Sequence, residues 1–120
     1  VVFMEKLHES LAGIVAGRIR ERYNKPAYVI SRAKDKAKGS GRSIEEYDMF
    51  EEISKCKDIL LGAGGHPMAA GFSLLEENID LFRDRLNKQC SLSDEDLVCK
   101  VDIDDILDLK DISFDLIEGL

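Results

Sequence analysis

The sequence predicts an α/β fold in which a mixed central β-sheet is flanked by helices. Short apolar segments rich in β-branched and aromatic residues alternate along the chain with segments of helical periodicity, as is typical of this class. With 120 residues, of which 44% are hydrophobic, the chain has the size and composition of one domain with one core. No apolar run approaches the roughly 20 residues of a membrane-spanning helix, and residues 1–10 do not resemble a signal peptide.

The first third of the chain predicts a strand, a helix and a second strand. Residues 1–4 are apolar and predict a short buried strand. Over residues 10–25 the apolar side chains recur every three or four positions, which predicts an amphipathic helix with Ser10 as its N-cap. Gly13 and Gly17 thin another side of this helix, and since each costs roughly 1 kcal/mol there, they indicate close packing or a close ligand. Residues 27–31 predict a central strand.

The remaining elements alternate in the same way. A strand is expected over residues 38–43, where Gly39 and Gly41 would mark a bulge or the approach of a ligand. The next expected elements are a short helix, a strand, a longer helix, a half-buried strand and a helix start, over residues 47–56, 69–75, 78–90, 97–103 and 112–120.

The net charge of −7 conceals an uneven distribution. Residues 18–42 contain nine Lys or Arg and two acidic residues, whereas residues 43–120 contain seven basic and twenty acidic residues. A basic segment on an acidic body can guide an anionic ligand to one place. The same charges are also compatible with a solvated face that has no partner.

The stretch GAGGHPMAAGF, residues 62–72, combines four glycines with a lone histidine. Gly64 and Gly65 can let the backbone approach a ligand, and consecutive N–H groups in such a turn can form an anion-binding nest. Pro67 restricts His66 to an extended conformation and so fixes the direction of the imidazole. The alternative is a glycine turn between two strands with a histidine that faces solvent.

The stretch GSGRS, residues 39–43, is a second candidate for an anion site. Arg42 offers a planar fork of donors that suits phosphate, and the hydroxyls of Ser40 and Ser43 could add contacts. The alternative is a polar loop with an exposed arginine.

Several classes of site are not indicated. Three widely spaced cysteines argue against a disulfide framework and favour a reducing, cytoplasmic location. Close pairs of zinc ligands are absent, as are a Walker loop, a nucleophile elbow and the clustered Asp and His ligands of a two-metal hydrolase. We therefore expect neither catalytic residues nor a metal site within this chain.

Taken together, these motifs resemble the DHHA1 domain of the DHH phosphoesterase superfamily, and most closely its RecJ family of single-stranded-DNA-specific exonucleases. Three blocks carry the resemblance: LHESLAGIVAGRIRERYNKPAYVIS, GSGRSIEEYDMFEEISKCKDILLGAGGHPMAAGFSL and KVDIDDILDLKDISFDLIEGL. Leu7 and Ser10 stand where the family usually has tryptophan and glycine. The resemblance implies a DHHA1 domain over residues 1–93 and an acidic connector over 94–120.

The resemblance implies a role in 5′-to-3′ hydrolysis of single-stranded DNA during recombination and repair. The chain is then expected to be an inactive fragment, with a DHH domain holding Mn²⁺ or Mg²⁺ upstream and an OB-fold downstream. His66 and Arg42 match the family positions that reach substrate phosphates, with Ser43, Gly64 and Gly65 beside them. His8 and Arg18 match weaker candidate positions.

Two other functions fit the same domain. One is the DHHA1 domain of an oligoribonuclease or cyclic-dinucleotide phosphodiesterase, whose chains end soon after it. The other is a non-catalytic nucleic-acid-binding module, such as the one at the end of alanyl-tRNA synthetase. The acidic segment from Asp94 onward and the SGRS and GIVAGR blocks favour the RecJ family.

Overall fold

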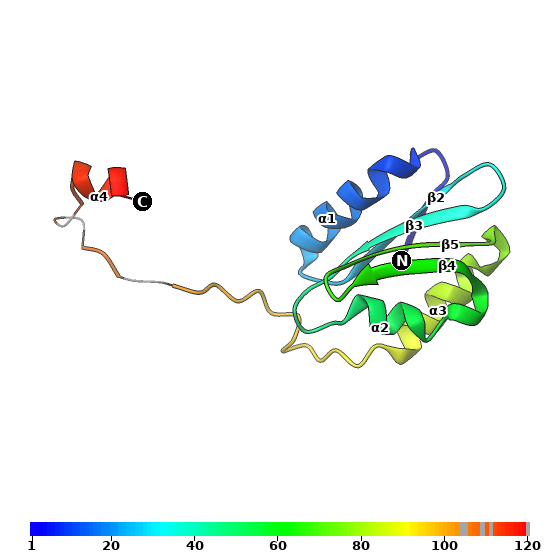
Figure 1. The fold of residues 1–120 in the computed structure, drawn as a ribbon. Helices are drawn as coiled ribbons and strands as arrows, with labels where there is room; N and C mark the ends of the chain where they lie inside the picture. Colours follow the sequence, from blue (N-terminus) through cyan, green and yellow to red (C-terminus); the bar gives the residue numbers. More distant parts are fainter. Residues whose placement is uncertain (104–105, 109, 111, 120) are drawn as a thin grey trace.

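A five-stranded mixed sheet forms the centre of the protein (Figure 1), as the sequence predicts. The structure is a computed structural model that describes residues 1–103, 106–108, 110 and 112–119. The strands are β1 (Val2–Met4), β2 (Ala27–Arg32), β3 (Ala37–Arg42), β4 (Leu60–His66) and β5 (Ala69–Leu74), in the order β1-β2-β3-β5-β4. Strand β1 runs parallel to β2, and the other neighbours are antiparallel.

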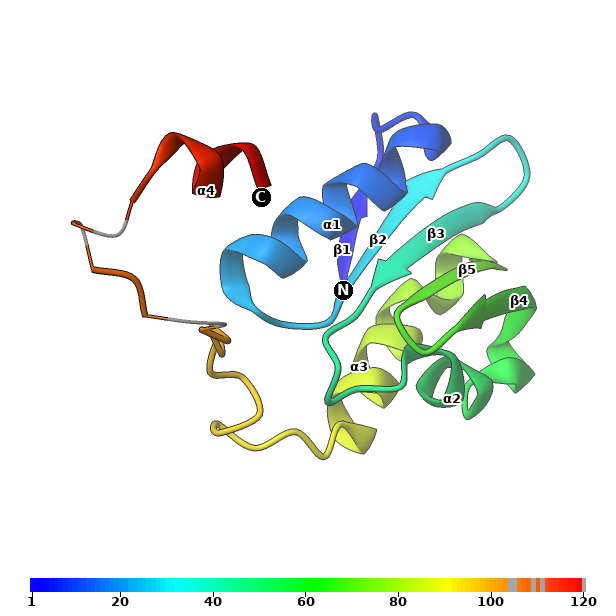
Figure 2. The same cartoon turned by 60° about the vertical axis from the view of Figure 1, so that its left-hand side comes forward.

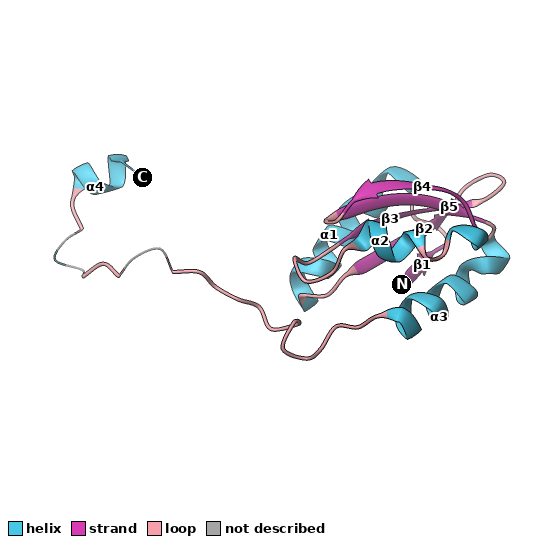
Figure 3. Ribbon diagram, turned by 60° about the horizontal axis from the view of Figure 1, so that its bottom comes forward, coloured by secondary structure: helices cyan, strands magenta, loops and turns pink. Residues whose placement is uncertain are grey.

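The helices cover the two faces of the sheet unequally. Helix α1 (Ala12–Tyr23) lies over β2 and β3 on one face, whereas α2 (Met49–Ser54) and α3 (Ile79–Gln89) lie on the other (Figures 2 and 3). Short 3-10 turns cover Glu9–Leu11, Lys57–Ile59 and Glu76–Asn78, and a last helix, α4, spans Phe114–Gly119. Because α1 covers only part of its face, β5 and β4 extend beyond it.

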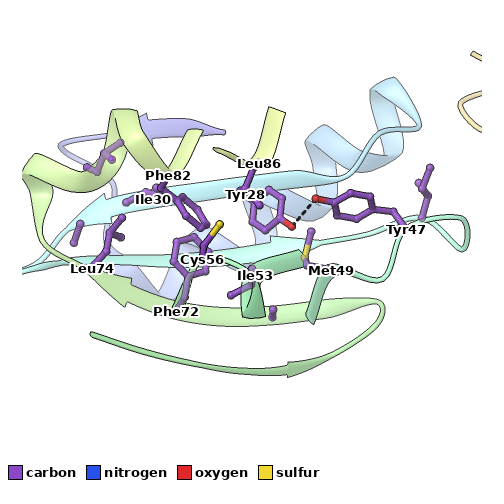
Figure 4. Packing of buried hydrophobic residues seen from close by; sticks show 14 residues of the cluster. Tyr28, Ile30, Tyr47, Met49, Ile53, Cys56, Phe72, Leu74, Phe82 and Leu86 are labelled. Atoms are coloured by element: carbon purple, nitrogen blue, oxygen red, sulfur yellow. Dashed lines mark hydrogen bonds between the residues drawn. The ribbon is translucent and has the colours of Figure 1, made fainter. Parts of the chain in front are cut away.

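The main core lies between the sheet and the pair α2 and α3 (Figure 4). The rings of Phe72 and Phe82 pack with their centroids 4.9 Å apart, and the hydroxyl of Tyr28 donates to that of Tyr47 at 3.1 Å. Burial raises the pKa of both tyrosines well above the ordinary value, so they remain neutral hydrogen-bonding groups. A smaller cluster of Ala12, Ala16 and Val29 lies under α1.

Two glycines of β3, Gly39 and Gly41, have a different role from the one that the sequence predicted. Gly39 and Gly41 point to the core face rather than to a ligand or a bulge. A Cβ at Gly39 would overlap the ring of Phe72, and a Cβ at Gly41 would overlap the sulfur of Met49. These glycines therefore leave room for large side chains that pack against the middle strand of the sheet.

The beginning and end of the chain differ from the prediction. Helix α1 starts at Ala12, after a 3-10 turn that His8 caps by accepting the Ser10 N–H, so Ser10 is not the N-cap. Strand β1 is an edge strand, and its side chains at Val2 and Met4 are exposed rather than buried. Residues 97–103 form no strand: they pair with none of the described strands, and Val101 is 80% exposed. The helix expected near the C-terminus is confirmed as α4.

Candidate functional site

The register of the sheet brings Arg42 and His66 into one row. Ala69 of β5 pairs with Arg42 of β3 on one side and with His66 of β4 on the other. Directly paired residues on antiparallel strands point to the same face of a sheet, so both side chains leave the face that carries α1. Their Cα atoms are two strand spacings, or about 10 Å, apart.

The surface around this row has almost no side chains. Where residues 62–66 of β4 pair with residues 69–73 of β5, the residues on this face are no larger than serine, apart from His66 itself, and they lie beyond the edge of α1. They are Ala69, Gly71, Ser73, Gly62 and Gly64. No atom lies within 4 Å of where a Cβ would stand on Gly64 or Gly71. A ligand can therefore rest directly on the main chain of β4 and β5.

The glycine stretch is a strand and not the turn that the sequence suggested. Leu60–His66 is extended β4, the edge of the sheet, so consecutive N–H groups alternate in direction and do not converge as a nest. Gly65 has φ 157°, and a Cβ there would overlap the Ala69 carbonyl oxygen and lie 2.6 Å from Cα of Ala70. Gly65 is thus required by the close approach of β4 and β5.

The imidazole of His66 is exposed at the end of β4. Its Nδ1 accepts the backbone N–H of Met68 at 3.3 Å across the turn. In the neutral ring the other nitrogen, Nε2, then carries the hydrogen and can donate it to a ligand oxygen. The local turn thereby favours one orientation of the ring and, in its neutral form, the tautomer with the hydrogen on Nε2.

Two backbone hydrogen bonds anchor the turn that carries His66. The N–H of Ser43 donates to the Met68 carbonyl at 2.9 Å, and the N–H of Met49 donates to the Pro67 carbonyl at 3.0 Å. Ser43 is buried, and its hydroxyl donates to the Tyr47 carbonyl at 2.6 Å. We therefore assign Ser43 to the support of the turn rather than to direct contact with a ligand.

Arg42 is half-buried beside α1 and is held by its own strand. Its Nη1 donates to the Ser40 hydroxyl at 3.0 Å and to the Gly41 carbonyl at 2.7 Å. Within the described residues no carboxylate forms an ion pair with Arg42, unlike Arg18, Arg32 and Lys38. The site thus contains an arginine whose charge is left for a ligand to neutralise.

A hollow of about 370 Å³ lies between Arg42 and α1. Arg18 shares it, although its guanidinium pairs with Glu21 at 3.2 Å. His8 does not join the group, because its neighbour Glu9 pairs with Lys38 at the opposite end of β3. Of the predicted residues, the structure therefore gathers Arg42, His66 and the glycines, with Ser40 and Arg18 beside them.

The basic segment 18–42 does not form one uninterrupted positive face. Acidic residues from elsewhere in the chain pair with two of its members: Glu5 and Glu76 with Arg32, and Glu9 with Lys38. The hydrogen bond from Arg32 holds the pKa of Glu76 below its ordinary value, so this carboxylate stays charged. Arg42 keeps its charge open to a ligand, and so do Arg22, Lys25, Lys34 and Lys36, which take part in none of the ion pairs among the described residues.

Sequence reasoning could not place two contributors to this site, Ala69 and Gly13, beside Arg42. Ala69 lies between Arg42 and His66 only because β5 is inserted between β3 and β4. Gly13 approaches Arg42 because α1 packs on β3. A glycine within a helix indicates close packing, but the sequence alone does not show that Arg42 is the residue that packs against Gly13.

Two kinds of feature are absent from the part of the chain that the structure describes. No group of three or more His, Cys, Asp or Glu side chains is placed to hold a metal ion. None of the described helices has the length and apolar character needed to cross a membrane.

Comparison with known proteins gives consistent matches. The DHHA1 domain family matches residues 1–92. The chain is 40% identical over 111 residues to the single-stranded-DNA-specific exonuclease RecJ of Bacillus subtilis, covering 89% of this chain and 14% of that protein. The chain thus spans about one seventh of this relative.

Solved structures show the same fold. The crystal structure of RecJ in complex with Mg²⁺ from Thermus thermophilus matches with a TM-score of 0.67 and 31% identity, over 72% of this chain and 14% of that one. The C-Ala domain of Aquifex aeolicus alanyl-tRNA synthetase matches with a TM-score of 0.55 over 72% of this chain and 86% of that one, and at 22% identity it shows the fold alone. From the family match over residues 1–92, the chain belongs to the DHHA1 domain family.

Proposed function

We propose that this chain is the phosphate-binding part of a RecJ-type exonuclease that degrades single-stranded DNA from 5′ to 3′ in recombination and repair. The observation that carries the proposal is the row in which Arg42 and His66 flank a bare stretch of main chain. The similarity to RecJ of Bacillus subtilis supports the choice of substrate.

Arg42 and His66 would both contact the phosphate. Arg42 would neutralise a phosphate with its planar donors, and Nε2 of His66 would donate a hydrogen bond to a phosphate oxygen or to charge that develops there. The bare glycine and alanine surface would let the sugar–phosphate chain lie against β5 and β4. Single-stranded DNA suits this surface, because its sugar–phosphate backbone can approach β4 and β5 without a complementary DNA strand in the way.

Hydrolysis would depend on another domain. In the proposed enzyme, Mn²⁺ or Mg²⁺ on a DHH domain upstream would activate water, and an OB-fold would follow the acidic connector 94–120. The 120-residue chain alone would bind single-stranded DNA weakly and hydrolyse nothing. A non-catalytic nucleic-acid-binding module is the second candidate, since the C-Ala domain has the same fold.

Binding of a labelled single-stranded oligodeoxynucleotide, measured by fluorescence anisotropy at low salt, tests the proposal. Arg42→Ala and His66→Ala should each weaken binding about tenfold, which is the range for loss of one charge-assisted hydrogen bond. Lys88→Ala is the matched control, since it removes one positive charge from an exposed position on α3, across the sheet.

Three results bear on the choice between candidates. Near-equal binding by all three variants would refute the phosphate site. Hydrolysis by the metal-loaded 120-residue chain would contradict the assignment of catalysis to another domain. Tighter binding of a tRNA acceptor stem than of single-stranded DNA would favour the non-catalytic module.

A further inference from the structure

Helix α1 approaches Arg42 most closely at Gly13. A Cβ built on Gly13 would stand 2.7 Å from Nη2 of Arg42, 3.2 Å from the Ser40 hydroxyl and 3.4 Å from Cζ of Arg42. The guanidinium and the Ser40 hydroxyl therefore both lie against the bare backbone of α1 at Gly13, and they are hydrogen-bonded to each other. Gly17, one turn further along the helix, has no atom within 4 Å of its Cβ position.

Glycine at position 13 lowers the stability of helix α1 but leaves space for the Arg42 guanidinium. Glycine in a helix interior is less favourable than alanine by roughly 1 kcal/mol, so alanine at position 13 would strengthen α1 itself. At position 13 the added methyl group would have to push the guanidinium aside, because 2.7 Å is shorter than any ordinary contact between a methyl carbon and a nitrogen. The hydrogen bonds of Arg42 to Ser40 and Gly41 hold the group in that narrow space.

We infer that Gly13 is a positioning residue, whose missing side chain allows α1 to clamp the guanidinium of Arg42 in the orientation that receives a phosphate. The inference rests on the proposed function, because it assigns Gly13 a part in ligand binding through Arg42. Gly13 itself makes no contact with the ligand and acts only through Arg42. It sets the place of the arginine, while Ser40 supports the same group from the sheet side.

A purely structural role for Gly13 gives a different expectation. If Gly13 served only the packing of α1, its substitution would lower the stability of the fold and leave the affinity of the folded protein unchanged. If it positions Arg42, the substitution lowers the affinity while the helix becomes no less stable. Affinity and thermal stability measured on the same variants therefore separate the two roles.

The experiment compares Gly13→Ala with Gly17→Ala in the 120-residue chain. Both add one methyl group to the same face of α1 and both line the hollow beside Arg42, so helix propensity and bulk are matched. Gly13→Ala should weaken binding of a labelled single-stranded oligodeoxynucleotide about threefold to tenfold by displacing a charge-assisted donor. Gly17→Ala should bind as the wild type does. Circular dichroism melting should show a Tm at or above that of the wild type for both.

A double-mutant cycle completes the test. In an Arg42→Ala background, Gly13→Ala should cause no further loss, because there is no guanidinium left to displace. Equal affinities of the Gly13→Ala and wild-type chains, or the same loss in the Arg42→Ala background, would overturn the inference. Unchanged affinity of Arg42→Ala alone would instead refute the proposed function, so the two failures are distinguishable.

Discussion

Arg42 and His66 stand on the two sides of Ala69, in one cross-strand row and on one face of the sheet. They are 24 positions apart in the sequence, and neither contacts the other through a hydrogen bond in the described structure. Their relationship is created by β5, which lies between β3 and β4. The small side chain of Ala69 keeps the space between them open.

The size of residue 69 should therefore control access to the site. Ala69→Val places a branched side chain between Arg42 and His66, while valine suits a strand and preserves the pairing. We expect the affinity for single-stranded DNA to fall about tenfold or more, because the valine side chain would keep a phosphate from contacting both Arg42 and His66. The Tm should change little. Fluorescence anisotropy and thermal melting measure the two effects.

Ser73→Val is the matched control for this prediction. Ser73 lies on the same face of β5, four residues further along the strand, opposite Lys38. The same added volume at that position lies at the far end of the bare surface and should lower binding less than Ala69→Val does. An equal loss in the two variants would show that the whole strand, rather than the space between Arg42 and His66, controls binding.

Most elements could be predicted from local sequence patterns, because periodicity and turn residues act within a few positions. The helix that begins near Gly13 and the strands around Arg42 and Ala69 are confirmed at nearly their expected bounds. The glycines of β4 were more difficult, because glycine weakens a strand and the pattern favours a turn. Pairing with β5 stabilises this strand, and pairing is a long-range property.

The site was predictable as a set of residue types but not as an arrangement. Arg42 and His66 were identified by their chemistry, and the sheet register then placed them together. Ser43 has the same chemistry as Ser40, yet the fold buries it under the turn. Which of the two nearby serines faces the candidate site depends on the alternation along β3 and on where that strand ends.

Gly65 should be the least replaceable glycine of the hairpin formed by β4 and β5. Gly65→Ala introduces a side chain at φ 157° that would overlap the backbone of β5, so we expect the free energy of unfolding to fall by about 1–3 kcal/mol. Gly64→Ala, the neighbouring control, meets no atom within 4 Å and should change stability little. Urea denaturation of both variants measures the difference. Equal stabilities would contradict the close approach of the two strands.

Ser43 should contribute to stability rather than directly to binding. Ser43→Ala removes the hydrogen bond to the Tyr47 carbonyl and leaves that buried acceptor unsatisfied, at a cost of about 1–2 kcal/mol in the free energy of unfolding. The backbone bond from Ser43 to Met68 remains, so the turn that carries His66 keeps its place. Ser40→Ala should show the opposite pattern, with weaker DNA binding and little loss of stability, because Ser40 accepts from Arg42. Urea denaturation and anisotropy on both variants decide the assignment, and a larger binding defect in Ser43→Ala would reverse it.

Acid should weaken the attachment of α3 through Asp58. Nη1 of Arg85 on α3 donates to both carboxylate oxygens of Asp58 at 2.7 Å, and this hydrogen bonding holds the pKa of Asp58 below its ordinary value. A carboxyl whose pKa is lower in the folded state adds stability above its unfolded pKa, near pH 4, and loses it as the pH falls through the folded value. Asp58→Asn should therefore be less stable than the wild type at neutral pH, and the difference should disappear as the pH falls through the lowered pKa of Asp58 in the folded protein.

The control for Asp58 is Asp84→Asn, which removes a carboxylate from an exposed position on α3 that takes part in none of the ion pairs of the described residues. Its stability relative to the wild type should vary less with pH than that of Asp58→Asn. Urea denaturation at a series of pH values gives both differences. A deficit of Asp58→Asn that persists unchanged into acid would show that the carboxylate stabilises the fold by packing, since the effect of its charge must disappear once it is protonated.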